Sequence, residues 1–192
     1  MKTTDDPRWS RLLGQSGACR CCGMAFNGLF DVQYSAPEAW PHGDEPEDNA
    51  AIVRDDADCL TEDFCRLGNY RFVRANLLLR IRDTGQSFGF GVWATVRPEV
   101  FEQAIDHFDA GVQGQIGTVF SWLSNILPNT PAKASEGHLT FHDDRIRPSY
   151  HLDDADNPFT ADQREGIDLD RLLDIYAMTG TDLRPHLEAT GV

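Results

Sequence analysis

The sequence predicts an α+β fold, in which an antiparallel sheet carries helices packed on one face and is preceded by an N-terminal cysteine knuckle. Two observations lead to this class. Segments that alternate with the two-residue period of strands dominate the first half of the chain, whereas most segments with helical periodicity and capping residues follow later. The apolar share of 41% and the aromatic share of 10% suffice for a packed core. With 192 residues, the chain suits one domain spanning 1–192.

The first part of that domain, residues 1–28, predicts a short helix followed by the knuckle. Thr4 or Asp5 can cap the helix, Pro7 fits its first turn, and Gly14 can end it. The stretch SGACRCCGMAFNGL, which follows, reads as a tight turn with thiols on both sides. We therefore expect helix and knuckle to precede the sheet directly.

An acidic loop separates this region from the main core. Residues 29–34 alternate as a short strand, and the loop, residues 35–58, contains three prolines and many carboxylates. A short helix is expected near Ala50. So long a loop in a compact domain is either functional or simply solvated.

The α+β core, residues 60–180, is organised around a central hairpin. In QSFGFGVWATVRPEVF, residues 86–101, large apolar residues alternate with Gly89, Gly91 and Trp93, which predicts a central strand. Glycines opposite large residues indicate that another group approaches closely on that side. Residues 70–81 predict the partner strand, joined through a turn.

Caps and periodicity predict the remaining elements of the core. They are a helix from Pro98 to Gly111, an apolar turn or short helix at 120–127, a second hairpin from 138–141 and 145–152, a short helix with a Thr160/Gln163 capping box, and a last helix capped by Asp168.

The charge of the chain restricts its partners. A formal net charge of -14 and a pI near 4.6 repel phosphate backbones, so we expect no nucleic acid partner. Such charge serves solubility, or attracts a basic partner protein; both interpretations stay open. The sequence has no run of about 18 apolar residues. The start MKTTDDPRWS also lacks the pattern of a signal peptide, so we expect a cytoplasmic protein without membrane contact.

Thiols carry the only chemistry that the sequence singles out. The five cysteines are Cys19, Cys21, Cys22, Cys59 and Cys65. An odd number without an export signal argues against a disulfide framework and favours free thiols, a metal or redox chemistry. Cys19 and Cys22 have the C-x-x-C spacing that lets two thiolates bind one Zn²⁺ at about 2.3 Å. We expect Cys59 and Cys65 to complete a structural zinc site, with His42 as an alternative ligand.

An enzyme centred on the same cysteines is the alternative. With only three protein ligands, a zinc ion would keep an open position that could activate water. The sequence contains no G-x-S-x-G, P-loop, dinucleotide-binding glycine motif or H-E-x-x-H. A non-enzymatic domain is therefore the favoured interpretation.

Other side chains have plain structural interpretations. Trp40 could anchor a partner or fold back onto the sheet. Nearby aspartates suit His138, His142 and His151 to a metal or acid/base cluster, although surface histidines near aspartates are common. Three arginines are expected to pair with carboxylates rather than to bind phosphate: Arg74, Arg145 and Arg147.

Six stretches identify a family. They are CRCCGMAFNGL, LTEDFCRLGNYRFVRA, FGFGVWATV, FSWLSNILPNTP, RIRPSYHL and NPFTADQREGI. In this order, from Cys19 to Ile167, they resemble a bacterial family known as domain of unknown function 2199. The resemblance implies a fold neighbourhood, no assigned reaction, and shared equivalents of Cys19, Cys22 and Cys65. The chain departs from the pattern at Asn157, where the family has a histidine before proline.

The sequence thus predicts an uncharacterised cytosolic protein that binds another protein, of an immunity or accessory type, and that is stabilised by cysteine-ligated zinc. A basic protein is the expected partner.

Overall fold

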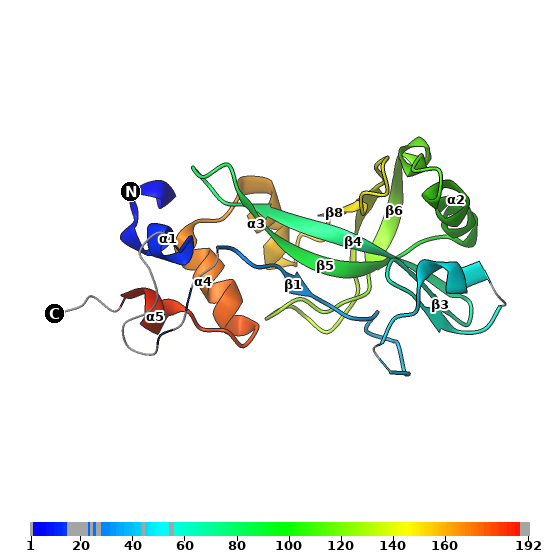
Figure 1. Cartoon of the computed structure of the whole chain (residues 1–192), viewed down its shortest axis with the longest axis horizontal. Helices are drawn as coiled ribbons and strands as arrows, with labels where there is room; N and C mark the ends of the chain where they lie inside the picture. The colour runs from blue at the N-terminus through cyan, green and yellow to red at the C-terminus, as the bar shows by residue number, and fades with distance from the viewer. Residues whose placement is uncertain are drawn as a thin grey trace. The chain divides into compact units, whose positions relative to one another are not determined.

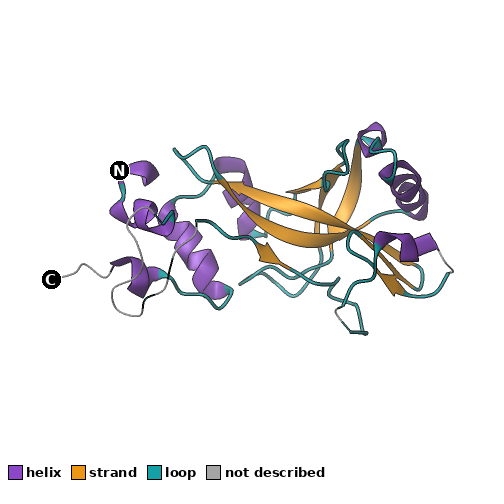
Figure 2. Ribbon diagram, in the orientation of Figure 1, coloured by secondary structure: helices purple, strands orange, loops and turns teal. Residues whose placement is uncertain are grey.

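The chain folds as a mixed α+β structure, as its sequence predicts (Figure 1; Figure 2). The computed structural model describes residues 2–14, 23, 25, 28–43, 45–53 and 56–188. The strands are β1 (Val32–Gln33), β2 (Cys59–Leu60), β3 (Phe64–Leu67), β4 (Tyr70–Arg80), β5 (Ser87–Thr95), β6 (Thr118–Leu123), β7 (Ser135–Thr140) and β8 (Ser149–Leu152). The α-helices are α1 (Pro7–Leu12), α2 (Pro98–Phe108), α3 (Pro158–Glu165), α4 (Leu169–Met178) and α5 (Arg184–Glu188). Short 3₁₀ helices are η1 (Thr3–Asp5), η2 (Asn49–Val53) and η3 (Gln113–Ile116).

Contacts divide the chain into two compact units. Unit 1 comprises residues 1–32, 79–89 and 161–192, and unit 2 comprises residues 33–78 and 90–160. Helix α2 belongs to unit 2, whereas α1, α4 and α5 belong to unit 1. That all residues form one domain, and that the helices share one face of the sheet, therefore stay predictions.

The strands follow the order β1-β5-β6-β7-β8-β4-β3-β2, and β5 also pairs with β4, so the strands from β4 to β8 form a closed ring. Neighbours are antiparallel in the pairs β2–β3, β3–β4, β5–β6, β6–β7 and β7–β8. Strands β4 and β8 are parallel, with Asn76 opposite Ser149. The predicted antiparallel sheet is wrong at this pair, because directions cannot alternate all the way around a ring with an odd number of strands.

The predicted central hairpin is confirmed as β4 and β5. Every residue of β5 between its two ends is buried. A Cβ at Gly91 would lie 1.9 Å from Oε1 of Gln33, and the Tyr34 amide donates to the Gly91 carbonyl at 2.9 Å. The close approach that the glycines predicted therefore comes from the segment containing Gln33 and Tyr34.

The interior of the β6–β8 meander is organised by Tyr150. This tyrosine is fully buried, and its hydroxyl donates to the carbonyl of Ser135 at 2.9 Å. Gly137 lies directly beside the ring, because a Cβ there would be 2.8 Å from the tyrosine hydroxyl oxygen. Only a residue without a side chain leaves room for Tyr150 at this place.

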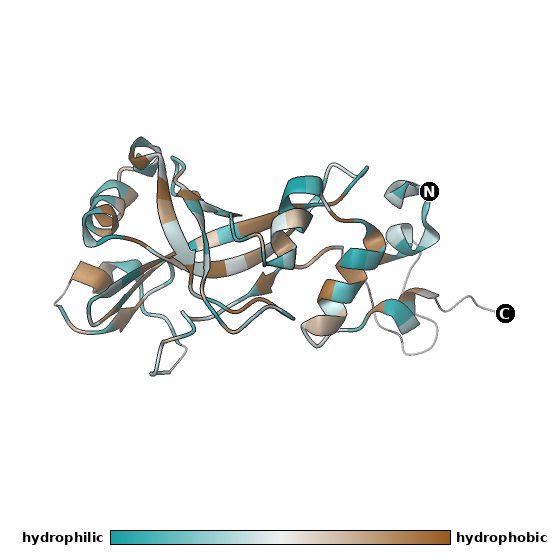
Figure 3. Cartoon of the chain, turned by 180° about the vertical axis from the view of Figure 1, so that it is seen from behind, coloured by the Kyte–Doolittle hydropathy of each residue, from teal (hydrophilic) through white to brown (hydrophobic). Residues whose placement is uncertain are grey.

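Helix α2 covers aromatic residues of unit 2. Apolar and polar residues alternate around it (Figure 3), and it buries Phe101 and Ala104. The ring of Phe64, on β3, meets the rings of Phe101 and Phe108 edge-on at 5.8 and 5.3 Å. These contacts confirm that the helix predicted from Pro98 lies on strand residues.

Unit 1 gathers the helices from both ends of the described chain (Figure 1). Asp6 caps α1 by accepting from the Arg8 amide at 2.9 Å, so the predicted caps at Thr4 or Asp5 are wrong by one or two residues. Asp168 caps α4 as predicted, accepting from the Arg171 amide at 2.9 Å. Helix α5 follows, so α4 is not the last helix.

Two further predictions are wrong. Residues 120–127 were expected to form an apolar turn or short helix, but residues 118–123 form strand β6. Burial alternates along this strand, with Ser121 and Leu123 buried and Phe120 and Trp122 facing outward. The capping box predicted at Thr160 and Gln163 does not begin α3, because Thr160 lies inside the helix and Asn157, just before it, accepts from the Phe159 amide at 3.0 Å.

None of the helices in the described part of the chain is both long and apolar enough to cross a membrane.

Candidate functional site

The predicted zinc site falls partly outside the described residues, which do not include Cys19, Cys21 and Cys22. The other two predicted ligands lie on neighbouring strands, Cys59 on β2 and Cys65 on β3. The register pairs Cys59 with Arg66 and Cys65 with Leu60. Because directly opposed residues share a face and successive residues alternate, the ladder places the two cysteines on opposite faces of the β2–β3 pair.

Cys65 has an apolar environment. It is fully buried in a cluster with Leu60, Phe72 and Trp93, against which Trp40 also packs. Burial, reinforced by nearby Cys59 and Asp58, raises the pKa of the Cys65 thiol to about 12. A metal would have to displace this proton, since thiolates are the ligand form. In the described ranges, no group of three or more His, Cys, Asp or Glu residues could hold a metal, and the four-cysteine site stays a prediction.

His42, the alternative ligand, pairs with an aspartate. Its Nε2 lies 3.2 Å from Oδ2 of Asp58, and its ring meets Trp40 edge-on at 4.8 Å. The Gly68 amide donates to Asp58 at 2.7 Å, which together with His42 lowers the pKa of that carboxyl. Trp40 donates to the Gly43 carbonyl at 3.1 Å and folds back onto the core cluster, which favours its structural interpretation.

The histidines considered as one cluster have separate partners. His138 forms an ion pair with Asp153 through Nδ1. His142 Nε2 lies 2.8 Å from the hydroxyl oxygen of Ser149. His138 and His151 lie directly opposite each other on β7 and β8, and a metal or acid/base role for the three histidines stays a prediction.

Aromatic side chains on the outer side of the β6–β8 meander form the clearest surface feature of unit 2. Phe120 is 53% exposed and Trp122 is 43% exposed, although both are large and apolar. Their rings meet edge-on with centroids 5.6 Å apart, and Phe120 also meets the His138 ring at 6.2 Å. This surface is not evident in the sequence, because residues 120–127 read as an apolar turn or short helix and not as a strand.

The strand register extends this surface across the meander. Phe120 lies opposite His138, which lies opposite His151, and Trp122 lies opposite Glu136. The Asp153 amide donates to the Glu136 carbonyl at 3.0 Å, so Asp153 continues the second row. We call these six residues the outer aromatic face: Phe120, Trp122, Glu136, His138, His151 and Asp153. It combines two exposed aromatic rings with two carboxylates.

Comparisons with known proteins give a family and no activity. The model of the family described as an uncharacterized protein conserved in bacteria (DUF2199) matches residues 18–167, well over half of the chain. No curated protein matches the chain, and no solved structure does. The family match agrees with the resemblance carried by the six sequence stretches. The chain therefore belongs to the DUF2199 family of uncharacterised bacterial proteins.

Proposed function

We propose that the protein is a non-enzymatic binding domain that recognises a basic partner protein through the outer aromatic face. The observation that carries this proposal is the exposed pair Phe120 and Trp122, held edge-on at 5.6 Å on a paired strand. Tryptophan and other large aromatic residues supply much of the binding energy in protein interfaces.

The position of the pair on a paired strand favours recognition. Trp122 is fixed from both neighbouring strands: its amide donates to the Thr95 hydroxyl at 3.2 Å on the β5 side, and it lies opposite Glu136 on β7. A partner would therefore meet side chains whose backbone is already ordered, which lowers the entropy cost of binding.

Charge defines the kind of partner. Glu136 is exposed beside Trp122, and Asp153, directly after the end of β8, lies next to Glu136. The whole chain has a net charge of -14. A lysine or arginine that stacks on the Trp122 ring would gain a cation–π contact and a neighbouring carboxylate together. The long-range field would also speed association with a basic protein.

The test compares three forms of the chain as bait in a lysate of the host bacterium, at low and at high salt. They are the wild type, the double variant Phe120→Ala/Trp122→Ala, and the control Tyr70→Ala. Tyr70 is 65% exposed on β4 and lies outside the face, so its loss removes a comparable exposed ring. Captured proteins are quantified by mass spectrometry.

We expect at least one basic protein to be captured by the wild type and the control and to fall at least tenfold with the double variant. High salt should weaken its capture. Equal capture by all three forms would refute the proposal. Self-association of the wild type that disappears in the double variant would also refute it, because the face would then bind a second copy.

A structural zinc ion is a separate part of the proposal, and it rests on the spacing of Cys19 and Cys22 with Cys59 and Cys65 as further ligands. Metal analysis of the purified chain and of Cys22→Ser tests it. Close to one zinc per chain, lost in the variant together with stability, supports a structural site. A metal-free, stable wild type contradicts it.

A further inference from the structure

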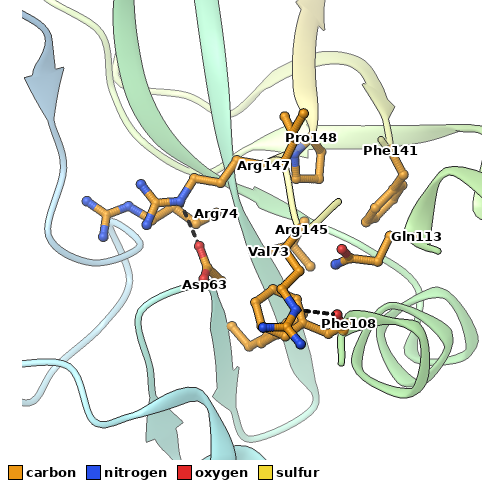
Figure 4. A pocket seen from close by; sticks show the side chains of 11 residues that line it. Asp63, Val73, Arg74, Phe108, Gln113, Phe141, Arg145, Arg147 and Pro148 are labelled. Carbon is orange, nitrogen blue, oxygen red and sulfur yellow. Dashed lines mark hydrogen bonds and ion pairs between the residues drawn. The ribbon is translucent and has the colours of Figure 1, made fainter. Parts of the chain in front are cut away.

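A narrow pocket in unit 2 has features that the outer aromatic face does not use (Figure 4). Its walls are mostly apolar and include Phe64, Val73, Phe108 and Phe141. It contains about 260 Å³ of empty space, part of it open to solvent, of which about 10 Å³ admits the centre of a water molecule. The enclosed part of the pocket therefore has room for about one water-sized group, and a longer ligand would extend from there into the open part.

Gln113, the first residue of η3, supplies an unused acceptor in this pocket. The residue is only 4% exposed, and its Oε1 has no hydrogen-bond partner among the described residues. In Figure 4 its amide points towards Val73 and Arg145. A buried carbonyl left without a donor costs about 1–3 kcal/mol. The pocket is therefore suited to a group that donates a hydrogen bond.

Arginines outnumber carboxylates around the same pocket: the described residues that line it include Arg74, Arg145 and Arg147 but one acidic residue, Asp63. The expected pairing with carboxylates is confirmed for Arg147, whose Nε lies 2.6 Å from Asp63 Oδ1. It is wrong for Arg145, which donates to the backbone carbonyls of Phe108 and Asp109 at 3.2 and 2.6 Å.

Arg74 shows the effect of this excess of positive charge. Its terminal nitrogen donates to Oε1 of Gln33 at 3.2 Å, and its Nε has no partner among the described residues. Burial, and then repulsion from Arg147, lowers the pKa of its guanidinium. An anion at the mouth of the pocket would relieve this repulsion.

The loop that supplies Arg145 is held in a strained conformation. Asp144 and Arg145 both have a φ of 58°, in the left-handed region that favours glycine. The Asp144 amide donates to the Gly111 carbonyl at 2.8 Å, and the Gly114 amide donates to Asp143 at 2.9 Å. Consecutive strained residues at the rim of a pocket are typical of ligand-binding sites.

We propose that this pocket binds a small, unbranched organic anion with a hydrogen-bond donor at its far end. Its carboxylate or phosphate group would meet Arg147 and Arg145 at the mouth, and its apolar chain would lie between Phe64 and Phe141. A hydroxyl or amine at the far end would donate to Oε1 of Gln113. The charged group gives affinity, and the buried acceptor gives specificity.

Four probes in titration calorimetry test this assignment: butyrate, 4-hydroxybutyrate, ethyl phosphate and 2-hydroxyethyl phosphate. We expect saturable binding at millimolar concentration or below, with each hydroxylated probe about tenfold tighter than its parent. That factor corresponds to about 1.4 kcal/mol, the net value of one hydrogen bond. The difference between the carboxylate and phosphate arms identifies the anionic group.

Variants locate the site. Gln113→Leu should abolish the preference for the hydroxylated probes while the parent anions still bind. Arg147→Gln should weaken all probes at least tenfold, and Arg164→Gln, at an arginine that is 71% exposed in unit 1, should change nothing. If Gln113→Leu does not fold, nuclear magnetic resonance of the wild type tests the same contact. The side-chain amide signal of Gln113 should shift when 4-hydroxybutyrate is added and should not shift with butyrate.

No saturable binding of any probe would overturn the proposal. So would a hydroxyl preference that survives Gln113→Leu, or an unshifted Gln113 amide in the wild type. None of these results bears on the capture experiment with the outer aromatic face, since the variants of the two experiments share no residue.

Discussion

Replacing Gly137 with alanine tests the interior of the meander that carries the outer aromatic face. The new Cβ would lie 2.2 Å from the carbonyl oxygen of His151 and 2.8 Å from the hydroxyl oxygen of Tyr150. The first of these atoms is backbone, so either β7 and β8 separate locally or Tyr150 leaves its place. Overpacking of this kind costs about 3 kcal/mol, at the upper end of the usual range. In a chain of this length, that lowers Tm by about 6–12 °C.

Urea unfolding followed by tryptophan fluorescence measures the loss. The matched control is Gly43→Ala, because a Cβ at Gly43 meets no atom of the described residues within 4 Å and its φ is not in the left-handed region. We expect the control to unfold with the wild type. Adding Tyr150→Phe should recover only part of the loss, since the carbonyl of His151 remains. A Gly137→Ala variant within about 0.5 kcal/mol of the wild type would refute the register of β7 and β8.

Two further predictions concern titratable groups. Hydrogen bonds from the Arg8 side chain lower the pKa of Asp6 below its ordinary 3.8, so the stability that Asp6 contributes is present above 3.8 and is lost as the pH falls through the lowered value. Asp6→Asn keeps an acceptor for the Arg8 amide, because asparagine caps helices about as well as aspartate, but it loses the charge that binds the Arg8 side chain. It should therefore reduce the free energy of unfolding by about 1 kcal/mol at pH 7, and urea unfolding should show this difference narrowing only below pH 3.8. A difference that is the same at both ends of the pH range would contradict the pairing. Burial raises the pKa of the Cys65 thiol to about 12. Iodoacetamide at pH 8 should therefore leave Cys65 unmodified in the native chain while half-buried Cys59 reacts, even with a zinc chelator present. Peptide mass spectrometry measures the labelling of both cysteines, and rapid labelling of Cys65 would contradict its burial.

Elements with strong local signals could be predicted from the sequence. Large and small residues alternate along β5, and apolar and polar residues alternate along much of β4. Asp168 comes directly before the apolar stripe of α4. In these places local pattern and tertiary burial agree, so the prediction needed no knowledge of distant contacts.

The outer aromatic face could not be predicted, because β6 reverses the usual pattern. Its small Ser121 is buried and its large Phe120 and Trp122 are exposed. Hydrophobic periodicity would place these aromatic side chains in the core. The β-propensity of the segment TVFSWL was the one signal available.

The pocket was missed for a different reason. Gln113, Arg145 and Asp63 come from segments far apart in sequence, and no spacing rule connects them. The arginines were interpreted by composition, since a chain so rich in acids offers each of them a carboxylate. In the structure Arg145 donates to backbone carbonyls instead, and these carbonyls come close to it only in the folded chain.

The parallel pairing of β4 with β8 affects how the chain folds during synthesis. Strand β3 pairs with the start of β4, but Asn76 finds its partners only once Pro148 and Ser149 have been synthesised. This part of the edge of β4 therefore stays unpaired while most of the core leaves the ribosome. Loop closure over such a span slows folding, and an unpaired strand edge promotes association with other nascent chains. Truncated chains that end before β8 should therefore aggregate during synthesis, whereas in the full chain β8 covers that edge of β4.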